Sequence, residues 1–497
     1  MPAVADHLLR PSRDEVRALA ASGEHGLVPL AHTFVDDLST PVAAYLKLRA
    51  ADPSSPSFLL ESAEQAQQVG RYSILGTRPS QVVRWSIGDD DADPYDLVAD
   101  LTEGARQAHV DGLPPFTGGA VGMFGYDLVR TVETSLGTPP NPDAVGLPDL
   151  AMMLTDTLVV FDHLDRRTTI LANVDVTGDA AALDAAYEAA ATEIGRVREV
   201  LAGPTPVAQP APRSTEPLRW ESNHTREAYE ATVGKIVEYI HAGDAFQVVP
   251  SQRWTAELPV EPFSVYRGLR AVNPSPYMYY LDFGDFQIAG ASPEPLLRVS
   301  GRRVETYPVA GTRRRTGNPA DDAELAAELL SDEKERAEHI MLVDLGRNDL
   351  GRVSEYGSVV VDELMKIDTF SHLLHISSLV SGTLAEGVRA IDALRSTLPA
   401  GTLSGAPKVR AMEIIDELEP VKRSWYAGAI GFLSYAGDLD TCINIRSVVV
   451  KDGLVHAQTG GGTVADALPA NEYEESVTKS LGTKRAIDVA ISQEDWA

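Results

Sequence analysis

The stretch Glu333 to Arg352 reads EKERAEHIMLVDLGRNDLGR and joins a charge-dense beginning to an apolar continuation. Glu335 and Glu338 are three residues apart, so both carboxylates lie on one face of a helix. The apolar residues that follow predict that this helix packs on a core, and Gly346 predicts its end. A solvated helix face alone would explain such a pair of glutamates.

A second acidic helix is predicted near the end of the sequence. Glu472, Glu475 and Lys479 follow one another at helical spacing after the glycine run 460–462. Mg²⁺ in proteins is usually held by one or two carboxylates together with water and the oxygens of an anionic substrate. The two helices could converge on one such ion, so the sequence predicts a magnesium-dependent site for a small anion.

Composition and charge limit the partners of this chain. Its 497 residues are long enough for two or three domains, and 44% hydrophobic residues indicate a globular protein with a large core. A formal net charge of −29 argues against nucleic acid and against anionic membrane surfaces, because both attract basic proteins. We therefore expect neither nucleic acid nor membrane among its partners.

The single cysteine, Cys442, fits a reducing compartment and excludes an internal disulfide. It lies within an apolar strand pattern, which favours a buried structural thiol over a nucleophile. The first residues include Asp6, Arg10 and Pro11 where a signal peptide would have its apolar core. No run of eighteen apolar residues occurs. These observations predict a cytoplasmic protein.

The chain divides at a proline-rich stretch, AGPTPVAQPAPRSTEP, which covers residues 202–217. It follows a long amphipathic pattern at 179–202 and has no apolar periodicity of its own. We place an N-terminal domain at 1–217 and a second domain at 218–497. The strand patterns succeed one another with helices grouped between them, which predicts an α+β fold rather than a parallel doubly wound sheet.

Some strand predictions bear directly on the chemistry. Residues 152–163 and 168–176 are predicted to form a hairpin, and residues 441–450 read as one continuous strand. Arginine in so apolar a strand either points to solvent or binds an anion in a dry site. The period of two places four side chains on one face of this strand: Cys442, Asn444, Arg446 and Val448.

Two histidines, His372 and His375, lie three apart in a largely apolar segment. No third ligand appears at a suitable spacing, so a histidine satisfied within the core is the default interpretation. A general acid or base is the sharper alternative. Glycine runs such as 460–462 let backbone N–H groups approach carboxylates or phosphates, but most only turn the chain. The P-loop and dinucleotide spacings are absent.

Several motifs occur in one order along the second half of the chain: AFQVVPSQRW at 245–254, NPSPYMYYLDF at 273–283, PAGTLSGAPK at 399–408, DTCINIRS at 440–447 and NEYEESVTK at 471–479. In this order they resemble the chorismate-utilising enzymes, and among them the large subunits of anthranilate synthases. The resemblance is dense from about residue 220 onward. It implies an α+β fold in which antiparallel sheets form a central sandwich with helices packed outside, and a chorismate-binding catalytic domain at 218–497.

The resemblance also indicates which nucleophile is used. Aminodeoxychorismate synthases typically carry a lysine where this chain has Ala310, and isochorismate synthases carry one where it has Gln247. Neither residue here can replace those lysines, which implies external ammonia. The implied reaction converts chorismate and ammonia to anthranilate and pyruvate, the first step of tryptophan biosynthesis. The alternatives are aminodeoxychorismate synthase, 2-amino-2-deoxyisochorismate synthase and a tryptophan sensor without catalytic activity.

The resemblance implies roles for particular residues. Mg²⁺ would be held by Glu338 and Glu475, supported by Glu335 and Glu472. The implied catalytic residues are His375, Glu294, Thr402 and Lys479, with Glu294 protonating the departing C4 hydroxyl and His375 assisting pyruvate elimination. The implied substrate-binding residues are Gly311, Thr312, Tyr426, Arg446, Gly460, Gly461 and Gly462.

The resemblance further implies regulation and a partner. Tryptophan would inhibit through a site that the 1–217 domain contributes, formed by Glu61, Ser62, Arg71, Pro274, Pro276, Tyr277, Met278, Gly290 and Ala291. Arg71 stands where relatives often have lysine. No cysteine lies in a nucleophile motif, so this chain cannot hydrolyse glutamine itself. A separate glutamine amidotransferase subunit, component II, is implied, with the 1–217 domain contacting it in a heterotetramer.

Overall fold

The strands form two large antiparallel sheets. The computed structural model describes residues 6–62, 68–89, 92–206, 216–369 and 373–493. Within these residues the eleven-stranded sheet contains, from edge to edge, β1 (Leu27–Val35), β8 (Arg167–Asp175), β7 (Thr157–Asp162), β3 (Tyr72–Thr77), β2 (Ser57–Glu61), β12 (Tyr277–Asp282), β13 (Phe286–Ser292), β22 (Ser447–Lys451), β23 (Leu454–Gly460), β11 (Ser251–Glu257) and β9 (Glu221–Ser222). The ten-stranded sheet contains β16 (Val309–Arg314), β18 (Leu373–Thr383), β15 (Arg303–Thr306), β14 (Pro295–Ser300), β21 (Leu439–Ile443), β20 (Ala429–Ser434), β5 (Gly119–Phe124), β6 (Leu150–Thr155) and β4 (Gln81–Trp85), with β17 (Val360–Thr369) paired to β18.

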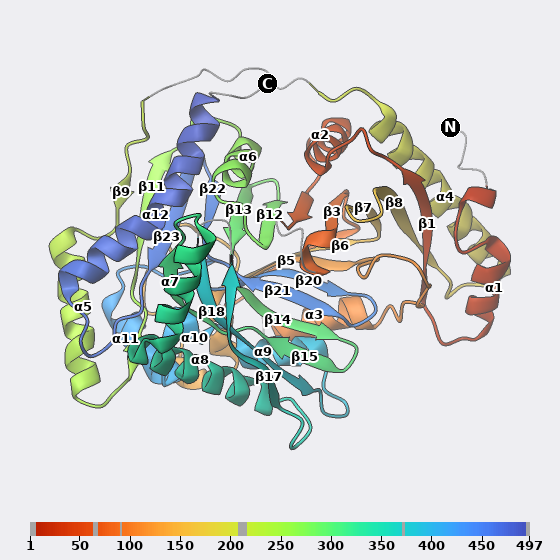
Figure 1. The fold of residues 1–497 in the computed structure, drawn as a ribbon. Helices are drawn as coiled ribbons and strands as arrows, with labels where there is room; N and C mark the ends of the chain where they lie inside the picture. The colour runs from red at the N-terminus through yellow and green to blue at the C-terminus, as the bar shows by residue number, and fades with distance from the viewer. Residues whose placement is uncertain (1–5, 63–67, 90–91, 207–215, 370–372, 494–497) are drawn as a thin grey trace.

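Helices pack on the outside of both sheets (Figure 1). They are α1 (Arg13–Ala21), α2 (Pro41–Ala51), α3 (Pro94–Glu103), α4 (Ala180–Ala202), α5 (Arg226–His241), α6 (Pro262–Val272), α7 (Pro319–Ser331), α8 (Glu333–Gly351), α9 (Ala390–Thr397), α10 (Gly401–Ser404), α11 (Lys408–Leu418) and α12 (Pro469–Ser492). Helices α2, α4, α6 and α12 contact the eleven-stranded sheet, whereas α3, α8 and α9 contact the ten-stranded sheet. A short pair, β10 (Gln247–Val248) and β19 (Gly405–Ala406), lies beside them.

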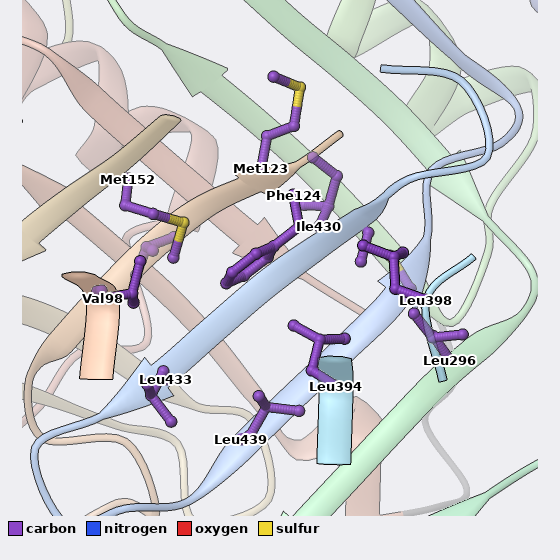
Figure 2. Close-up of a cluster of buried hydrophobic side chains, with 14 of the residues drawn as sticks. Val98, Met123, Phe124, Met152, Leu296, Leu394, Leu398, Ile430, Leu433 and Leu439 are labelled. Carbon is purple, nitrogen blue, oxygen red and sulfur yellow. The ribbon is translucent and has the colours of Figure 1, made fainter. Parts of the chain in front are cut away.

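Alternate side chains of each strand enter two different cores. In β12, Tyr279 and Leu281 belong to the cluster that includes the ten-stranded sheet, whereas Tyr280 belongs to the cluster under the outer helices. Figure 2 shows the first cluster, in which Ile430 of β20 lies among side chains of β5 and of the helices α3 and α9. The predicted sandwich of antiparallel sheets with helices outside is confirmed.

Both sheets continue across the proline-rich stretch. Strand β2 pairs with β12, and β5 pairs with β20, so each sheet contains strands from both sides of residues 217 and 218. The long helix predicted at 179–202 is observed as α4, which begins where the side chain of Asp179 accepts a hydrogen bond from the N–H of Ala182. The domain boundary at 217/218 stays a prediction and does not coincide with a gap in either sheet.

Two stretches predicted as single strands are each two strands in different sheets. The stretch 152–163 divides at Asp156 into β6 and β7, and 441–450 divides at 444–446 into β21 and β22. Only β7 forms the predicted hairpin with β8. Because both sheets are buried, the apolar pattern continues through each crossing and does not reveal it. The prediction of one shared face is therefore wrong for the set Cys442, Asn444, Arg446 and Val448.

Helix α8 is longer than its sequence predicts. The carboxylate of Asp332 caps it by accepting a hydrogen bond from the N–H of Lys334 at 3.0 Å. The helix then continues through Gly346 to Gly351, so the prediction that Gly346 ends it is wrong. A Cβ at Gly346 would lie 3.1 Å from Cγ2 of Thr306. This glycine allows close packing and does not stop the helix.

Two further observations bear on the expectations for the whole chain. Cys442 is buried, as predicted, and burial raises the pKa of its thiol. Among the described residues, no helix is both long enough and apolar enough to span a lipid bilayer.

Candidate active site

A cavity of about 220 Å³ opens between the two sheets, beside α10 and α12. We call it the central cavity. The predicted site residues that line it are Glu294, Thr312, His375, Thr402, Tyr426, Arg446, Gly460, Gly461, Gly462 and Lys479. The sequence did not single out several other lining residues, namely Val249, Pro293, Val309, Leu403, Ile445, Gln458 and Thr459. Ala310 also lines the wall, so no lysine amine enters the cavity at that position.

Arg446 reaches the central cavity because the chain crosses between the sheets at this point. Its φ of 51° is unusual for a residue with a side chain and turns the backbone out of β21 before β22 begins. Its Nη1 donates to the carbonyl oxygen of Lys479 at 2.5 Å. Burial lowers the pKa of the guanidinium, which nevertheless stays charged near neutral pH. The guanidinium therefore belongs to the cavity wall, as the anion-binding alternative requires.

Lys479 supplies the second positive charge of the cavity. Its Nζ lies 2.7 Å from Oε1 of Glu475 and donates to the carbonyl oxygen of Gly460 at 3.1 Å. The side chain thus ties helix α12 to the glycine run that follows β23. A Cβ at Gly462 would lie 2.1 Å from Nε2 of Gln247. Glycine at 462 therefore leaves room for the side chain of Gln247, which would have to shift for any larger residue.

Glu294 is a half-buried acid that lines the same cavity. Burial raises its pKa to about 7, and the hydroxyl of Thr402 donates to its Oε1 at 2.9 Å. Its backbone oxygen accepts a hydrogen bond from the N–H of Ile443 at 3.0 Å. A carboxyl group with this pKa is half protonated near neutral pH, so it can act as a general acid.

His375 lies at the edge of the cavity beside an irregular part of β16. Its Nδ1 is 3.1 Å from the carbonyl oxygen of Gly311 and 3.0 Å from the hydroxyl of Thr312. A carbonyl oxygen only accepts, so Nδ1 carries the proton and Nε2 remains the proton acceptor. Burial lowers the pKa of the ring, which favours this neutral form. The other predicted histidine, His372, lies outside the described residues.

The two acidic helices approach each other at the mouth of the cavity. Lys334 of α8 pairs with Asp466, just before α12, at 3.2 Å. Burial and the charge of Glu475, with a further contribution from Glu338, raise the pKa of Glu472 to about 7. Burial also raises the pKa of Glu338. The structure thus places Glu472 and Glu475 together beside Gly461, with Glu338 near enough to influence Glu472. Glu335 instead pairs with the guanidinium of Arg313 at 3.0 Å.

These carboxylates fit a divalent cation of the magnesium type. Among the described residues, no three side chains of the types that commonly hold a metal ion are clustered. Mg²⁺ needs only one or two protein carboxylates when a substrate and water supply the rest. Oε2 of Glu472 is buried and has no hydrogen-bond partner in the described chain. A Cβ added at Gly461 would lie 3.3 Å from Oε2 of Glu472 and 3.2 Å from Oε1 of Glu475, so both oxygens face the same small space. A cation there would compensate Oε2 of Glu472, whereas Oε1 of Glu475 is already paired with Nζ of Lys479 at 2.7 Å.

A second cavity lies between β2, β12, β20 and β21, and we call it the effector cavity. The predicted effector residues that line it are Glu61, Ser62, Pro276, Tyr277 and Met278. It is closed by residues that the sequence did not single out, including Tyr72, Tyr279, Arg298, Ile430, Phe432, Asp440 and Cys442. Their apolar strand pattern resembles that of any core strand, so no signal in the sequence distinguishes them.

The remaining predicted effector residues do not line this cavity. Arg71 instead pairs with Asp162 at 2.6 Å and with Asp165 at 2.9 Å. Pro274 is exposed in the turn before β12. Gly290 and Ala291 lie in β13, opposite Tyr279 and Met278 of β12. Gly290 and Ala291 therefore pair with two residues that line the cavity but do not line it themselves.

Several known proteins are similar to this chain in sequence and in fold. A family of chorismate binding enzymes matches residues 55–482. Anthranilate synthase component 1 of Pseudomonas putida is 46% identical, over 96% of this chain and 99% of its own length. The component 1 of Thermus thermophilus is 44% identical, over 93% of this chain and 98% of its own length.

Solved structures agree with these matches. The anthranilate synthase component I of Streptococcus pneumoniae has a TM-score of 0.75 and 37% identity, covering 91% of this chain and 99% of its own. The menaquinone-specific isochorismate synthase of Escherichia coli has a TM-score of 0.71 at 16% identity, covering 96% of this chain and 98% of its own, and shows the fold alone. The chain therefore belongs to the chorismate binding enzyme family and, within it, to the anthranilate synthase component 1 group.

Proposed function

We propose that this chain converts chorismate and ammonia to anthranilate, pyruvate and water in a Mg²⁺-dependent lyase reaction. The central observation is that Glu294, a carboxyl group with a pKa of about 7, shares a cavity with the cations of Arg446 and Lys479. A dianionic substrate needs positive charge, and expulsion of a hydroxyl group needs a positioned acid. The cavity wall has alanine at 310, which supports ammonia as the external nucleophile.

The residues of the cavity have three different roles: binding the substrate, donating a proton and accepting a proton. Arg446 and Lys479, with the hydroxyl of Tyr426 and the N–H groups of 460–462, bind the substrate carboxylates. Glu294 gives its proton to the C4 oxygen as the C4–O bond breaks and ammonia bonds to C2, and Thr402 keeps the carboxyl group aligned. His375 accepts a proton in the elimination of pyruvate through its Nε2.

Glu338 and Glu475 would hold Mg²⁺, with Glu335 and Glu472 in support. The ion would neutralise a substrate carboxylate and make it a better electron sink. The oxygen of Glu472 that is buried without a hydrogen-bond partner among the described residues supports such a cation site. Burial and the nearby charge of Glu335 raise the pKa of Glu338, and a bound cation would favour its charged form.

Product analysis tests the proposed reaction. The purified chain should form anthranilate and pyruvate from chorismate, Mg²⁺ and an ammonium salt. Accumulation of 4-amino-4-deoxychorismate, isochorismate or 2-amino-2-deoxyisochorismate would contradict it. Binding of tryptophan without any turnover would instead identify a sensor.

Glu475→Gln should raise the Mg²⁺ concentration needed for half-maximal activity by at least about tenfold, because a neutral amide is a poorer ligand than a carboxylate. The measurement is a Mg²⁺ titration of turnover at saturating chorismate. Glu474→Gln is the matched control, since Glu474 lies on the same helix and pairs at the surface with Arg226 at 2.8 Å. An unchanged requirement in Glu475→Gln would remove this residue from the ligand set.

We also propose that ammonia comes from a glutamine amidotransferase subunit, in a cytoplasmic heterotetramer. Two observations support a partner: the relatives are named component 1, and the single thiol of this chain is buried in β21. A buried thiol with a raised pKa is a poor nucleophile. Free ammonium should replace glutamine in the isolated chain.

The effector cavity supports inhibition by tryptophan. It combines apolar walls with the buried carboxylate of Asp440 and the hydroxyl of Ser62, which suits an aromatic amino acid. Ser62→Ala should raise the tryptophan concentration for half-maximal inhibition by about tenfold, the cost of one hydrogen bond to a charged group. Turnover without tryptophan should stay near that of the unchanged chain. Equal loss of turnover and inhibition would show that Ser62 is only structural.

A further inference from the structure

Residues 443–447, which we call the crossover segment, connect the effector cavity to the central cavity. Just before it, Asp440 and Cys442 line the effector cavity. Near its end, Ile445 and Arg446 line the central cavity. The two cavities therefore share one short piece of backbone, which leaves the ten-stranded sheet at β21 and enters the eleven-stranded sheet at β22.

The crossover segment also holds two other parts of the active site. The N–H of Ile443 donates to the backbone oxygen of Glu294 at 3.0 Å. The carbonyl oxygen of Asn444 accepts from the N–H of Ala427 at 3.1 Å, directly after Tyr426. A displacement of this segment would move the acid, the tyrosine and Arg446 together.

One buried hydrogen bond joins the segment to the wall of the effector cavity. The hydroxyl of Tyr279 donates to Oδ1 of Asn444 at 2.8 Å, and both side chains are fully buried. Tyr279 is one of the residues that line the effector cavity. Its ring lies close over Gly290 of β13, where a Cβ would be only 2.2 Å from Cζ of the ring. A ligand that displaces this ring would therefore lengthen or break the hydrogen bond to Asn444.

Two features of the crossover segment cost conformational or solvation free energy in the folded chain. Arg446 has a φ of 51°, a region that costs roughly 1 to 2 kcal/mol for a residue with a Cβ. The Nδ2 of Asn444 is buried without a hydrogen-bond partner among the described residues. A rearrangement that returned Arg446 to a negative φ and gave Nδ2 a partner would relieve both. The observed conformation of the segment is therefore held against these two costs by its surroundings.

We propose that the hydrogen bond between Tyr279 and Asn444 transmits occupancy of the effector cavity to Arg446. This inference rests on the proposed binding of tryptophan there. An aromatic amino acid in the cavity shifts the Tyr279 ring, the hydrogen bond to Asn444 breaks, and the crossover segment relaxes. Arg446 then leaves the central cavity and chorismate binds less well. By linkage, chorismate must weaken tryptophan binding by the same factor.

Tyr279→Phe tests this coupling, because it removes one hydroxyl group and keeps the ring. Tryptophan binding is measured by calorimetry without chorismate and then with saturating chorismate and Mg²⁺ in the absence of ammonia, so that no turnover occurs. In the unchanged chain, chorismate should weaken tryptophan binding. In Tyr279→Phe, tryptophan alone should bind at least as tightly as in the unchanged chain, because the hydrogen bond that it must break is already absent. The weakening by chorismate should shrink about fivefold, the value of one neutral hydrogen bond.

Tyr280→Phe is the matched control. Tyr280 is the next residue of β12, is equally buried, points into the other core, and its hydroxyl has no hydrogen-bond partner among the described residues. In Tyr280→Phe, chorismate should weaken tryptophan binding by the same factor as in the unchanged chain. Asn444→Ala removes the same hydrogen bond from the other side, and the double variant with Tyr279→Phe should lose no more coupling than either single variant.

Three results separate the outcomes. Full coupling retained in Tyr279→Phe would overturn the proposed route while leaving tryptophan binding intact. Equal loss of coupling in Tyr280→Phe would mean that general loosening of β12 is responsible, which also overturns it. If the unchanged chain binds no tryptophan, the proposed effector function itself is wrong.

Discussion

Glu294→Gln should reduce turnover of chorismate by about 10²- to 10⁴-fold, the usual contribution of a general acid. Glutamine has nearly the same shape and its oxygen can still accept the hydrogen bond from Thr402, but it has no acidic proton to give to the C4 oxygen. Chorismate binding, measured by calorimetry with Mg²⁺ and without ammonia, should change little. Anthranilate fluorescence gives the rate. A variant with normal turnover would exclude Glu294 as the acid.

The pH dependence gives a second test of the same group. Burial places the pKa of Glu294 at about 7, above its ordinary value near 4.5. The protonated acid is therefore abundant below pH 7 and is lost as the pH rises through 7, so the rate through this acid should fall on the alkaline side. The concentration of free ammonia must be held constant across the series, because it increases with pH and would hide the fall in rate. Thr402→Ser, which keeps the hydroxyl group, should show the same fall in rate above pH 7.

Arg446→Ala should reduce kcat/KM for chorismate by about 30- to 1,000-fold, corresponding to about 2 to 4 kcal/mol for a desolvated charge-assisted contact. Most of the loss should appear in KM, because this guanidinium binds a carboxylate that is present before and during the reaction. The substitution does not alter the cost of the backbone, since alanine and arginine both carry a Cβ at the positive φ of 51°. The change is therefore confined to the side chain.

Arg446→Lys is the control for charge. It keeps the cation but lacks the planar fork that grips a carboxylate through two N–H groups, so an intermediate loss is expected. Thermal unfolding should show nearly the same melting temperature for all three chains. A large fall in melting temperature together with an unchanged KM would mean that Arg446 is structural.

Local patterns in the sequence predict much of the fold correctly. The helix predicted at 179–202 follows from apolar spacing and is observed as α4. The helical spacing of Glu472, Glu475 and Lys479 predicts the helix observed as α12, which places these three residues on one side. Gln247 and Ala310 indicate the nucleophile through the resemblance to chorismate-utilising enzymes, some of which carry lysine at these positions. Local patterns fail where a single run of apolar residues passes between two buried sheets, since burial on both sides of the crossing looks the same.

The sequence by itself determined the repertoire of groups: the acids, the two cations, the glycine run and the absence of lysine at positions 247 and 310. Those are chemical properties of residues and do not depend on distant contacts. Only the tertiary structure decided which groups meet. The left-handed turn at Arg446 moves a guanidinium out of a strand face and into a cavity, and burial by remote segments raises the pKa of Glu294 to about 7. The effector cavity likewise exists only where β2 of the first half pairs with β12 of the second, because neither strand can form that wall alone.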